Sequence, residues 1–248
     1  MSLSASVTAR ALDLPPLYSL VALREAGDAF AHARAIAAEK GAGTLVWVGR
    51  YDLAEFAVVL EPDEALVKAR LALYACMNAL ADALASLAPP GRPITFDWPD
   101  AIHIDGVLVG GGRLGWPEGT REDETPDWLV FSAMIRTAVA REDESGRKPM
   151  AGALEELGFD AIDTGEIIAS FSRHLMTAFY ERSEIGFTPL ARRWLERFAS
   201  KDQNVQIADN GDLLVSEKAQ RGLTGRRSLA EALASPSWLD PVTGMPWL

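Results

Sequence analysis

The sequence predicts an α/β (α+β) fold in which helices flank a mixed central β-sheet and a small β-rich module follows. Segments with apolar residues at helical spacing alternate with short runs rich in Val, Leu and aromatic residues. Asp105 and Gly106 separate two such runs and have the residue types that a type I′ hairpin turn requires. A second turn of this kind, Asn210-Gly211, lies between short apolar runs near the C-terminus.

The length and composition suit one main domain with a small appendage. The chain has 248 residues, of which 48% are hydrophobic, and this suffices for a sizeable core. We expect a flexible lead-in at residues 1–16, a main domain at 17–199 and a β-rich module with a Trp- and Pro-containing tail at 200–248. The tail at 235–248 is expected to dock on the body, because exposed Trp pairs are unusual.

The first half of the main domain predicts two helices around two strands. Apolar spacing predicts a helix from about Asp28 to Lys40, ended by glycines. Residues 44–49 and 55–62 are rich in Val, Leu and aromatic residues and predict adjacent strands. An amphipathic pattern then predicts one helix from Asp63 to Leu87 that packs on the sheet.

The second half predicts further strands and then covering helices. Residues 94–116 predict two paired strands joined at the Asp105-Gly106 turn. The charged segment 117–127 predicts an exposed loop, and residues 128–139 predict the next strand. Helices are expected at about 165–182 and 189–197.

Charge and cysteine content exclude several classes of partner and site. With 35 acidic and 24 basic residues, the net charge of −11 repels phosphate backbones, so no nucleic-acid partner is expected. No apolar run approaches the roughly 20 residues of a membrane span, and no signal peptide is recognised, so we expect no membrane partner and a cytoplasmic location. A single cysteine, Cys76, excludes an internal disulfide and a Cys-rich metal site.

Several motifs in a fixed order resemble a known family. They are the triplet Trp98-Pro99-Asp100, the hairpin glycines Gly110-Gly111-Gly112, the strand at 128–139, and an Asn-Gly turn followed by an Arg-rich helical segment at 210–233. This order is similar to the catalytic domain and small C-terminal domain of the biotin and lipoate protein ligases. The resemblance spans about Leu17 to Leu233. It implies a class II synthetase-like sheet, acyl adenylation with ATP and Mg²⁺, and a biotinyl or lipoyl carrier domain as partner.

The family's catalytic motifs have changed chemistry in this chain. The family's catalytic lysine is expected just before the glycines, where this sequence has the aliphatic run 107–109. The lysine that precedes the Trp-Pro pair in biotin ligases corresponds to Asp97, and the Asn-Asp that follows corresponds to Asp100-Ala101. The Ser-Thr-Asn that contacts biotin aligns loosely with residues 25–27. A Gly- and Arg-rich nucleotide loop is replaced by the short link at 49–55, which contains Arg50.

Nine residues are the candidates for ligand binding. They are Trp98, Pro99, Asp100, Gly110, Gly111, Gly112, Arg113, Arg50 and Arg136. The tryptophan either lines a ligand or is a buried aromatic at a strand end, and the glycines either let a ligand approach the backbone or allow close packing. Either Arg113 or Arg136 could receive a carboxylate or phosphate, or each could be an ordinary solvated or ion-paired surface arginine.

Other reactive residue types point to structural roles. Cys76 lies in the apolar stripe of a helix, which favours a core thiol over an acyl-transfer nucleophile. His32, His103 and His174 lack metal-ligand spacing, so no metal site is expected. The acidic run 122–124 is typical of a solvated loop.

Two functional hypotheses follow from these observations. The first is a ligase-like protein that binds a small acyl or vitamin-like carboxylate near the Trp-Pro-Asp and glycine motifs, with ATP and Mg²⁺ as cofactors only if ligase activity survives. The alternative is a noncatalytic scaffold that keeps the ligase fold and binds a carrier domain. No catalytic residue is assigned from the sequence.

Overall fold

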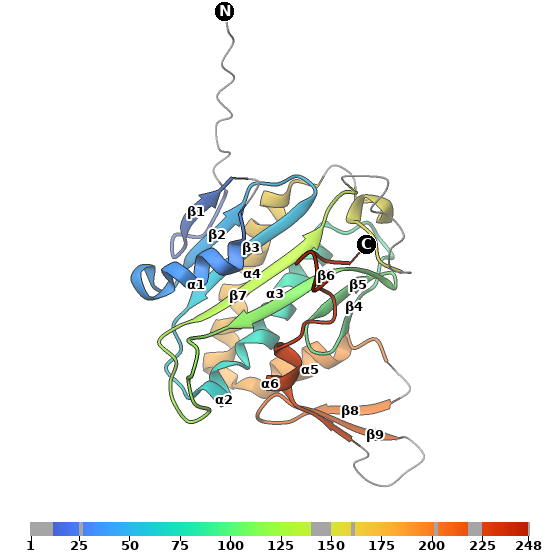
Figure 1. The fold of residues 1–248 in the computed structure, drawn as a ribbon. Coiled ribbons are helices and arrows are strands. Elements are labelled where there is room, and N and C mark those ends of the chain that lie inside the picture. Colours follow the sequence, from blue (N-terminus) through green and yellow to red (C-terminus); the bar gives the residue numbers. More distant parts are fainter. Residues whose placement is uncertain are drawn as a thin grey trace, which may run out of the picture.

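A seven-stranded sheet forms the centre of the computed structural model, which describes residues 12–24, 27–139, 150–159, 162–200, 203–217 and 225–247 (Figure 1). The strand order is β1-β2-β3-β7-β6-β5-β4. The strands are β1 (Ser19–Leu23), β2 (Thr44–Val48), β3 (Leu53–Leu60), β4 (Ile94–Asp97), β5 (Ala101–Ile104), β6 (Val107–Gly115) and β7 (Leu129–Arg136). β1 is parallel to β2 and the other pairs are antiparallel, so the predicted mixed sheet is confirmed.

The sheet has two covered faces because side chains alternate along each strand. On the inner face, Phe56 of β3 and Phe131 of β7 contact Phe171 of α4 (Thr164–Ile185) with ring centroids 4.7 and 5.7 Å apart. The same large core includes α3 (Ala72–Leu87). On the outer face, α1 (Ala29–Lys40) packs small side chains such as Ala33 against Val46 and other strand valines. In Figure 1, α1 lies in front of the sheet and α3 and α4 lie behind it.

β1 was not predicted from the sequence. The strand is short and lies at the edge of the sheet, and three of its five residues are exposed. It therefore lacks the buried, alternating pattern by which a strand is recognised in a sequence. Its parallel pairing with β2 is made possible by α1, which carries the chain back between them.

The prediction of one continuous helix over residues 63–87 was wrong. The segment forms α2 (Leu66–Ala69) and α3, and residues 63–65 are not helical. The backbone amides of Leu66 and Val67 donate to the carbonyl oxygens of Glu124 and Glu122, at 2.8 and 3.1 Å. These long-range bonds satisfy the first amides of α2 and fix where it begins, and a local pattern does not reveal them.

The hairpin turn is confirmed, but its segment holds three strands and not two. Asp105 and Gly106 have φ of 52° and 80°, the left-handed pair of a type I′ turn, between β5 and β6. β4 precedes them and pairs with β5 through the turn at Trp98–Asp100, which contains a cis Trp98–Pro99 peptide bond.

The C-terminal module also follows the prediction. After α5 (Phe187–Glu196), the strands β8 (Gln203–Ile207), β9 (Leu213–Glu217) and β10 (Gly225–Arg227) form a three-stranded antiparallel sheet, and α6 (Leu229–Leu233) follows. A one-turn 3-10 helix, η2 (Leu154–Leu157), precedes α4. Tyr74 of α3 donates to the carbonyl oxygen of Gly211 at 2.5 Å and ties the module to the main sheet's helices.

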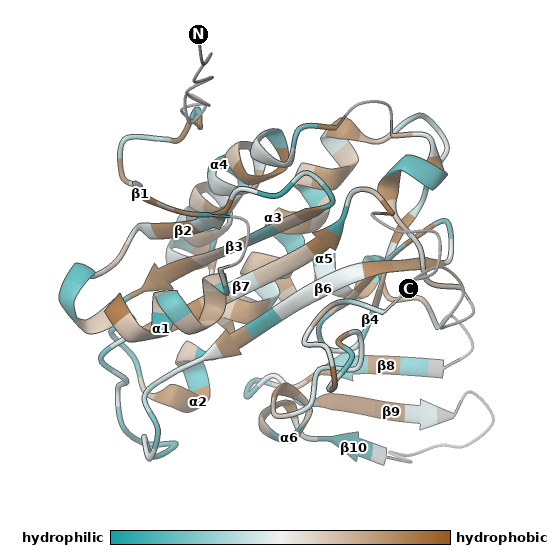
Figure 2. Cartoon of the chain, turned by 45° about the horizontal axis from the view of Figure 1, so that its top comes forward, coloured by the Kyte–Doolittle hydropathy of each residue, from teal (hydrophilic) through white to brown (hydrophobic). Residues whose placement is uncertain are grey.

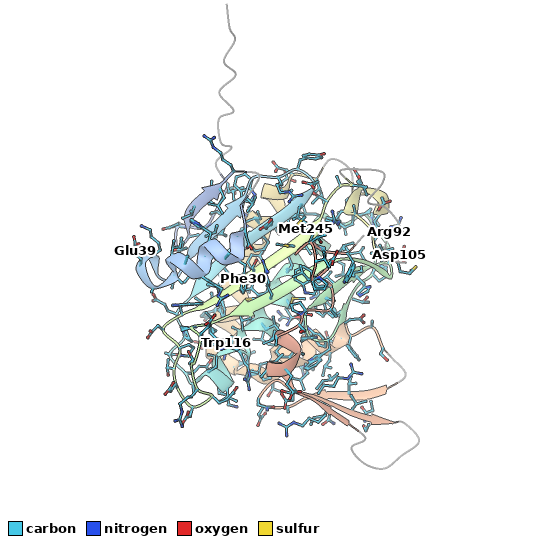
Figure 3. All side chains as sticks on the ribbon, viewed as in Figure 1. Phe30, Glu39, Arg92, Asp105, Trp116 and Met245 are labelled. Atoms are coloured by element: carbon cyan, nitrogen blue, oxygen red, sulfur yellow. The ribbon has the colours of Figure 1, made fainter. Side chains whose placement is uncertain are left out.

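The C-terminal tail docks on the outer face, as expected. Trp238 is fully buried, and Leu239, Met245 and Trp247 pack around it. Phe30 of α1 and Met245 of the tail mark the two segments that cover this face in Figure 3. Within the described ranges, no helix is both long and apolar enough to cross a membrane.

Candidate functional site

Trp98 faces the helices on the inner side of the sheet. Its indole Nε1 donates to the hydroxyl of Tyr74 at 2.9 Å, and its half-buried ring packs on the main core. Burial raises the pKa of Tyr74, so this phenol stays protonated and acts as a donor to Gly211. Pro99, beside it, is buried. The aromatic therefore anchors the β4–β5 turn to α3, which is the structural alternative for this residue.

Asp100 ends the same turn as a buried carboxyl. Its relative exposure is 0%, and neither oxygen has a hydrogen-bond partner among the described residues. Burial raises the pKa of Asp100 to about 7; the nearby Trp238 indole and the backbone favour the ionised form and limit the rise. The indole Nε1 itself donates to the carbonyl oxygen of Gly112 at 3.1 Å. Asp100 is therefore a group that can hold or release a proton near neutral pH.

The three glycines of β6 are required by close packing. A Cβ on Gly110, whose φ is +147°, would lie 1.9 Å from the carbonyl oxygen of Met134. A Cβ on Gly111 would lie 2.6 Å from the Trp238 ring, and one on Gly112 would lie 2.6 Å from Phe131. The pale middle of β6 in Figure 2 reflects these glycines. The packing explanation therefore accounts for all three, and Trp238 occupies the space above Gly111.

The tail covers the part of the outer face formed by β5, β6 and the neighbouring ends of β3 and β7. Trp238 forms a buried cluster with Leu53, Leu108 and Met134. Leu108 is 4% exposed and lies in the aliphatic run where the resemblance would place a lysine. An aliphatic side chain under a tryptophan supplies no positive charge to this face.

Two of the candidate arginines are engaged by neighbours. Arg50 forms a two-pronged ion pair with Asp52, with Nε–Oδ1 and Nη2–Oδ2 distances of 3.0 and 2.6 Å. Burial acts to raise the pKa of Asp52, but Arg50 outweighs it and the pKa is lowered. Arg136 is 5% exposed and donates to the carbonyl oxygen of Pro246 in the tail at 2.9 Å. The β2–β3 link that contains Arg50 is only four residues long, 49–52.

The third arginine belongs to a partly buried group of polar side chains, which we call the outer-face polar cluster: Asp28, Glu55, Arg113 and Ser132. Glu55 and Ser132 are buried, whereas the Asp28 side chain is 56% exposed. The cluster lies where α1 begins, over β3, β7 and β6. Arg113 Nη2 lies 3.4 Å from Asp28 Oδ1, and its guanidinium lies 4.2 Å from the centre of the Phe30 ring. Arg113 also stands opposite Ser132 in the β6–β7 pairing.

Burial shifts the ionisation of this cluster. Glu55 is 2% exposed and accepts a hydrogen bond from the Ala29 amide at 2.9 Å, so it caps α1 from the sheet. Burial raises the pKa of Glu55, and the Ala29 bond offsets part of the rise. Burial lowers the pKa of Arg113, against the attraction of Asp28 and Glu55.

Two buried polar atoms of the cluster are unpaired. The Oγ of Ser132, which is 0% exposed, and the Nε of Arg113 have no hydrogen-bond partner in the described part of the chain. Sequence reasoning found Arg113 but missed Ser132 and Glu55. A signal existed, because both are polar residues on otherwise apolar strands, at positions that face away from the aromatic core. Of residues 25–27, Glu25 and Ala26 lie outside the described residues.

Other reactive side chains are core or dispersed. Cys76 is fully buried, and burial raises its pKa, so the thiol is unreactive where it stands. Among the residues that the structure describes, no three His, Cys, Asp or Glu side chains gather as a metal site would require.

The chain was compared with known proteins at the level of family, sequence and structure. The model of the Biotin/lipoate A/B protein ligase family matches residues 14–196, and the comparison with curated proteins gives no match. A biotin protein ligase-like protein of unknown function from Silicibacter sp. TM1040 is 24% identical, with a TM-score of 0.74 over 86% of this chain and 96% of that chain.

Two solved biotin protein ligases share the fold at lower identity. The enzyme from Aquifex aeolicus in complex with biotin and ATP is 14% identical, with a TM-score of 0.64 over 84% of this chain and 98% of that chain. The enzyme from Leishmania major in complex with biotin is 14% identical, with a TM-score of 0.56 over 82% of this chain and 95% of that chain. The family match covers well over half of the sequence. This chain therefore belongs to the biotin/lipoate A/B protein ligase family.

Proposed function

We propose that this chain binds a small acyl or vitamin-like carboxylate at the outer-face polar cluster, beside Asp100 and the glycines of β6. The observation that carries the proposal is the pair of buried atoms without partners, Ser132 Oγ and Arg113 Nε. Leaving such a group unpaired costs about 1–3 kcal/mol. A native fold that keeps two of them side by side on paired strands is well suited to a ligand that supplies the missing bonds.

The chemistry of the cluster suits an oxygen-bearing ligand with an apolar body. The Arg113 guanidinium can donate to a carboxylate or carbonyl oxygen, and Ser132 can donate or accept. Phe30 and Met134 supply apolar surface at its edges. Solved ligases of this fold were captured with biotin, or with biotin and ATP, which makes biotin the first ligand to test.

We expect binding without adenylate formation. Leu108 is aliphatic, Arg136 is held by the tail, and Arg50 is paired with Asp52. No free cation at these three positions is offered to an α-phosphate. ATP and Mg²⁺ should therefore add nothing to the binding of the acid.

The test is a thermal-shift titration of the full chain with biotin, lipoate and octanoate, each with and without ATP and Mg²⁺. A ligand at 100 times its Kd stabilises the folded state by about 2.7 kcal/mol, which gives a measurable rise in Tm. One acid should raise the Tm, Arg113→Gln should abolish the rise, and the exposed control Arg121→Gln should keep it. If none of the acids raises the Tm, the proposal fails.

Ser132→Ala separates a ligand contact from a structural role. Removing an unpaired buried hydroxyl should leave the free protein equally stable or up to about 1 kcal/mol more stable. The same substitution should raise the Kd for the acid about tenfold, since one hydrogen bond to the ligand is lost. A loss of stability with unchanged affinity would contradict the assignment of Ser132.

A second candidate is a noncatalytic scaffold that binds a carrier domain. The specific observation in its favour is that Trp238 and Leu108 fill the part of the outer face next to the glycines. Purified biotinyl or lipoyl carrier domain should then bind the chain with no small acid present. Release of pyrophosphate from ATP with any of the three acids would contradict both this candidate and the expectation of binding without adenylation.

A further inference from the structure

The outer-face polar cluster has two carboxyl groups and one guanidinium around the position proposed for the carboxylate of the ligand. Asp28 and Glu55 supply the carboxyls, and both act electrostatically on Arg113. Arg34 also acts on Arg113, but its Nη2 lies 3.6 Å from a carboxylate oxygen of Glu118, so it already belongs to an ion pair. A ligand carboxylate would therefore add a third negative charge around one guanidinium.

Glu55 lies within electrostatic range of that carboxylate. The pairing of β3 with β7 places Ala57 opposite Ser132, which makes Glu55 and Ser132 diagonal neighbours on the outer face. Diagonal neighbours in an antiparallel pair lie about 7–8 Å apart. Glu55 and Ser132 are 2% and 0% exposed, so little water or salt screens a charge on one from a charge bound at the other.

Glu55 is the carboxyl of the cluster that is best placed to become neutral. It is buried, whereas the Asp28 side chain is half exposed. Burial raises the pKa of Glu55, and the hydrogen bond from the Ala29 amide offsets part of the rise. Of the charged groups that face it, Asp28 raises this pKa and Arg50 and Arg113 lower it, and β7 brings no charged side chain at positions 132 and 134. A protonated Glu55 still accepts the bond from Ala29, because one carboxyl oxygen remains an acceptor.

We infer that Glu55 takes up a proton from solvent when the acid binds, so that the carboxylate adds no net charge to the cluster. This role rests on the proposed function, and it makes Glu55 the residue that links affinity for the acid to pH. The link is reciprocal, because a ligand that favours the protonated form of Glu55 binds more tightly where that form is already populated. Affinity for the acid should therefore fall as pH rises through the pKa of Glu55, and affinity for a neutral ligand of the same shape should not.

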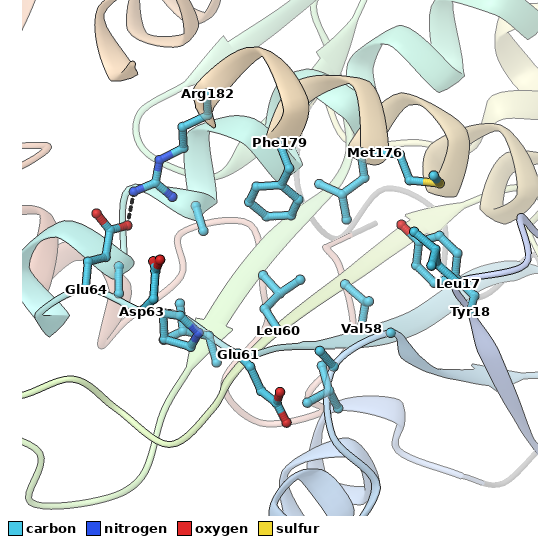
Figure 4. Close-up of a pocket in the computed structure, with 18 residues that line it drawn as sticks. Leu17, Tyr18, Val58, Leu60, Glu61, Asp63, Glu64, Met176, Phe179 and Arg182 are labelled. Carbon is cyan, nitrogen blue, oxygen red and sulfur yellow. Dashed lines mark hydrogen bonds and ion pairs between the residues drawn. The ribbon is translucent and has the colours of Figure 1, made fainter. Parts of the chain in front are cut away.

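A cavity of about 530 Å³ between α4 and the end of β3 is a second place that an acid with an apolar body could enter (Figure 4). Its walls are mostly apolar and include Leu60, Met176 and Phe179. Arg182, the cation among its lining residues, forms an ion pair with Glu64, which Figure 4 draws as a dashed line. Glu55 does not line this cavity, so an acid bound there would leave the protonation of Glu55 unchanged.

The test is the Kd of biotin, lipoate and octanoate and of their primary amides, measured by isothermal titration calorimetry of the full chain at pH 6 and pH 8. The three acids are ionised at both pH values, and the amides keep their shape without the charge. For an acid that binds, the Kd should be about tenfold higher at pH 8 than at pH 6, and the Kd of its amide should be the same at both. The binding enthalpy of the acid at pH 7.5 should also differ between phosphate and Tris, because a proton taken up by the protein comes from the buffer.

Four variants assign the proton and the site. Glu55→Gln keeps an oxygen for the Ala29 amide and cannot titrate, so the Kd of the acid should be the same at pH 6 and pH 8. Asp28→Asn keeps an N-cap side chain and should retain the pH dependence. Glu118→Gln, a control carboxylate that is 94% exposed, should also retain it. Met176→Trp, which fills the cavity of Figure 4, should leave binding of the acid unchanged.

Each other outcome overturns the role of Glu55. Binding of an acid with the same Kd at both pH values, a pH dependence that persists in Glu55→Gln, or its loss in Asp28→Asn would do so and leave the proposed function standing. Binding that Met176→Trp abolishes would place the acid in the cavity and overturn both, as would an absence of binding by all three acids. If circular dichroism shows that Glu55→Gln is unfolded, the comparison of phosphate with Tris in the wild type decides, and equal enthalpies overturn the role.

Discussion

Asp100 should make the stability of this protein fall as pH rises from acid to neutral. The unfolded chain ionises this carboxyl near pH 3.8 and the folded chain near pH 7. Between these values the unfolded state holds fewer protons than the folded state, so each pH unit removes about 1.4 kcal/mol of folding free energy. Over the whole interval the loss is about 4 kcal/mol, and it is complete above pH 7.

The perturbation that isolates this effect is Asp100→Asn, which keeps the shape and cannot ionise. The free energy of unfolding of the variant, relative to the wild type, should rise by about 3 kcal/mol between pH 4.5 and pH 8. The quantity compared is the change of this free-energy difference with pH and not its absolute value, because the buried Asn side chain has its own cost that does not depend on pH. Contributions of Glu55, whose pKa is also raised, are common to both proteins and cancel.

Urea denaturation followed by tryptophan fluorescence at half-unit steps of pH measures this difference. Asp123→Asn is the matched control, because its carboxylate is 71% exposed and its removal should leave the pH profile unchanged. The reasoning is refuted if wild type and Asp100→Asn have parallel profiles across this range.

Three further substitutions test the packing of the outer face and core. Gly111→Ala should lower the free energy of unfolding by about 1–3 kcal/mol, because the added Cβ would lie 2.3 Å from the Asp100 carbonyl oxygen. Gly225→Ala is the control, since a Cβ there meets open space. Equal stabilities of the two variants by urea denaturation would contradict this explanation. Trp238→Ala should cost about 3–5 kcal/mol and the half-buried Trp247→Ala clearly less, and the reverse order would show that the tail is anchored elsewhere. Cys76→Ala should lower the free energy of unfolding by about 1 kcal/mol and leave ligand binding unchanged. The buried thiol of the native protein should react slowly with a thiol reagent. Rapid modification of the folded protein would contradict a purely structural role for Cys76.

Local patterns were enough for most of the elements. The helix at α1 was predicted from its apolar spacing and from the glycines that end it, and Gly41 is its C-cap in the structure. Asp28, at the expected start, is its N-cap. The Asp105-Gly106 turn was predicted because few residue pairs tolerate two left-handed positions in succession. β1 and the break between α2 and α3 could not be predicted, because each depends on partners that are distant in the sequence.

For the candidate site residues, the tertiary structure adds contacts that the sequence does not reveal. The structure shows Asp100 and Arg113 as polar groups with buried atoms that have no partner among the described residues, and it shows Trp98 against the helices and the glycines in close packing. Whether these residues bind a ligand stays a prediction. Nothing local in the sequence indicates that Trp238, more than a hundred residues later, fills the space above Gly111.

The sequence by itself determined the mixed sheet with its covering helices, the β-rich module, the docked tail, the buried thiol and the absence of a lysine before the glycines. These features depend on spacing and residue type, which a linear pattern records. Only the tertiary structure decided which polar groups are buried without partners, which arginines are already paired, and where a cavity remains. Those properties arise from side chains brought together across distant segments, such as Glu55 with α1 and Arg136 with the tail.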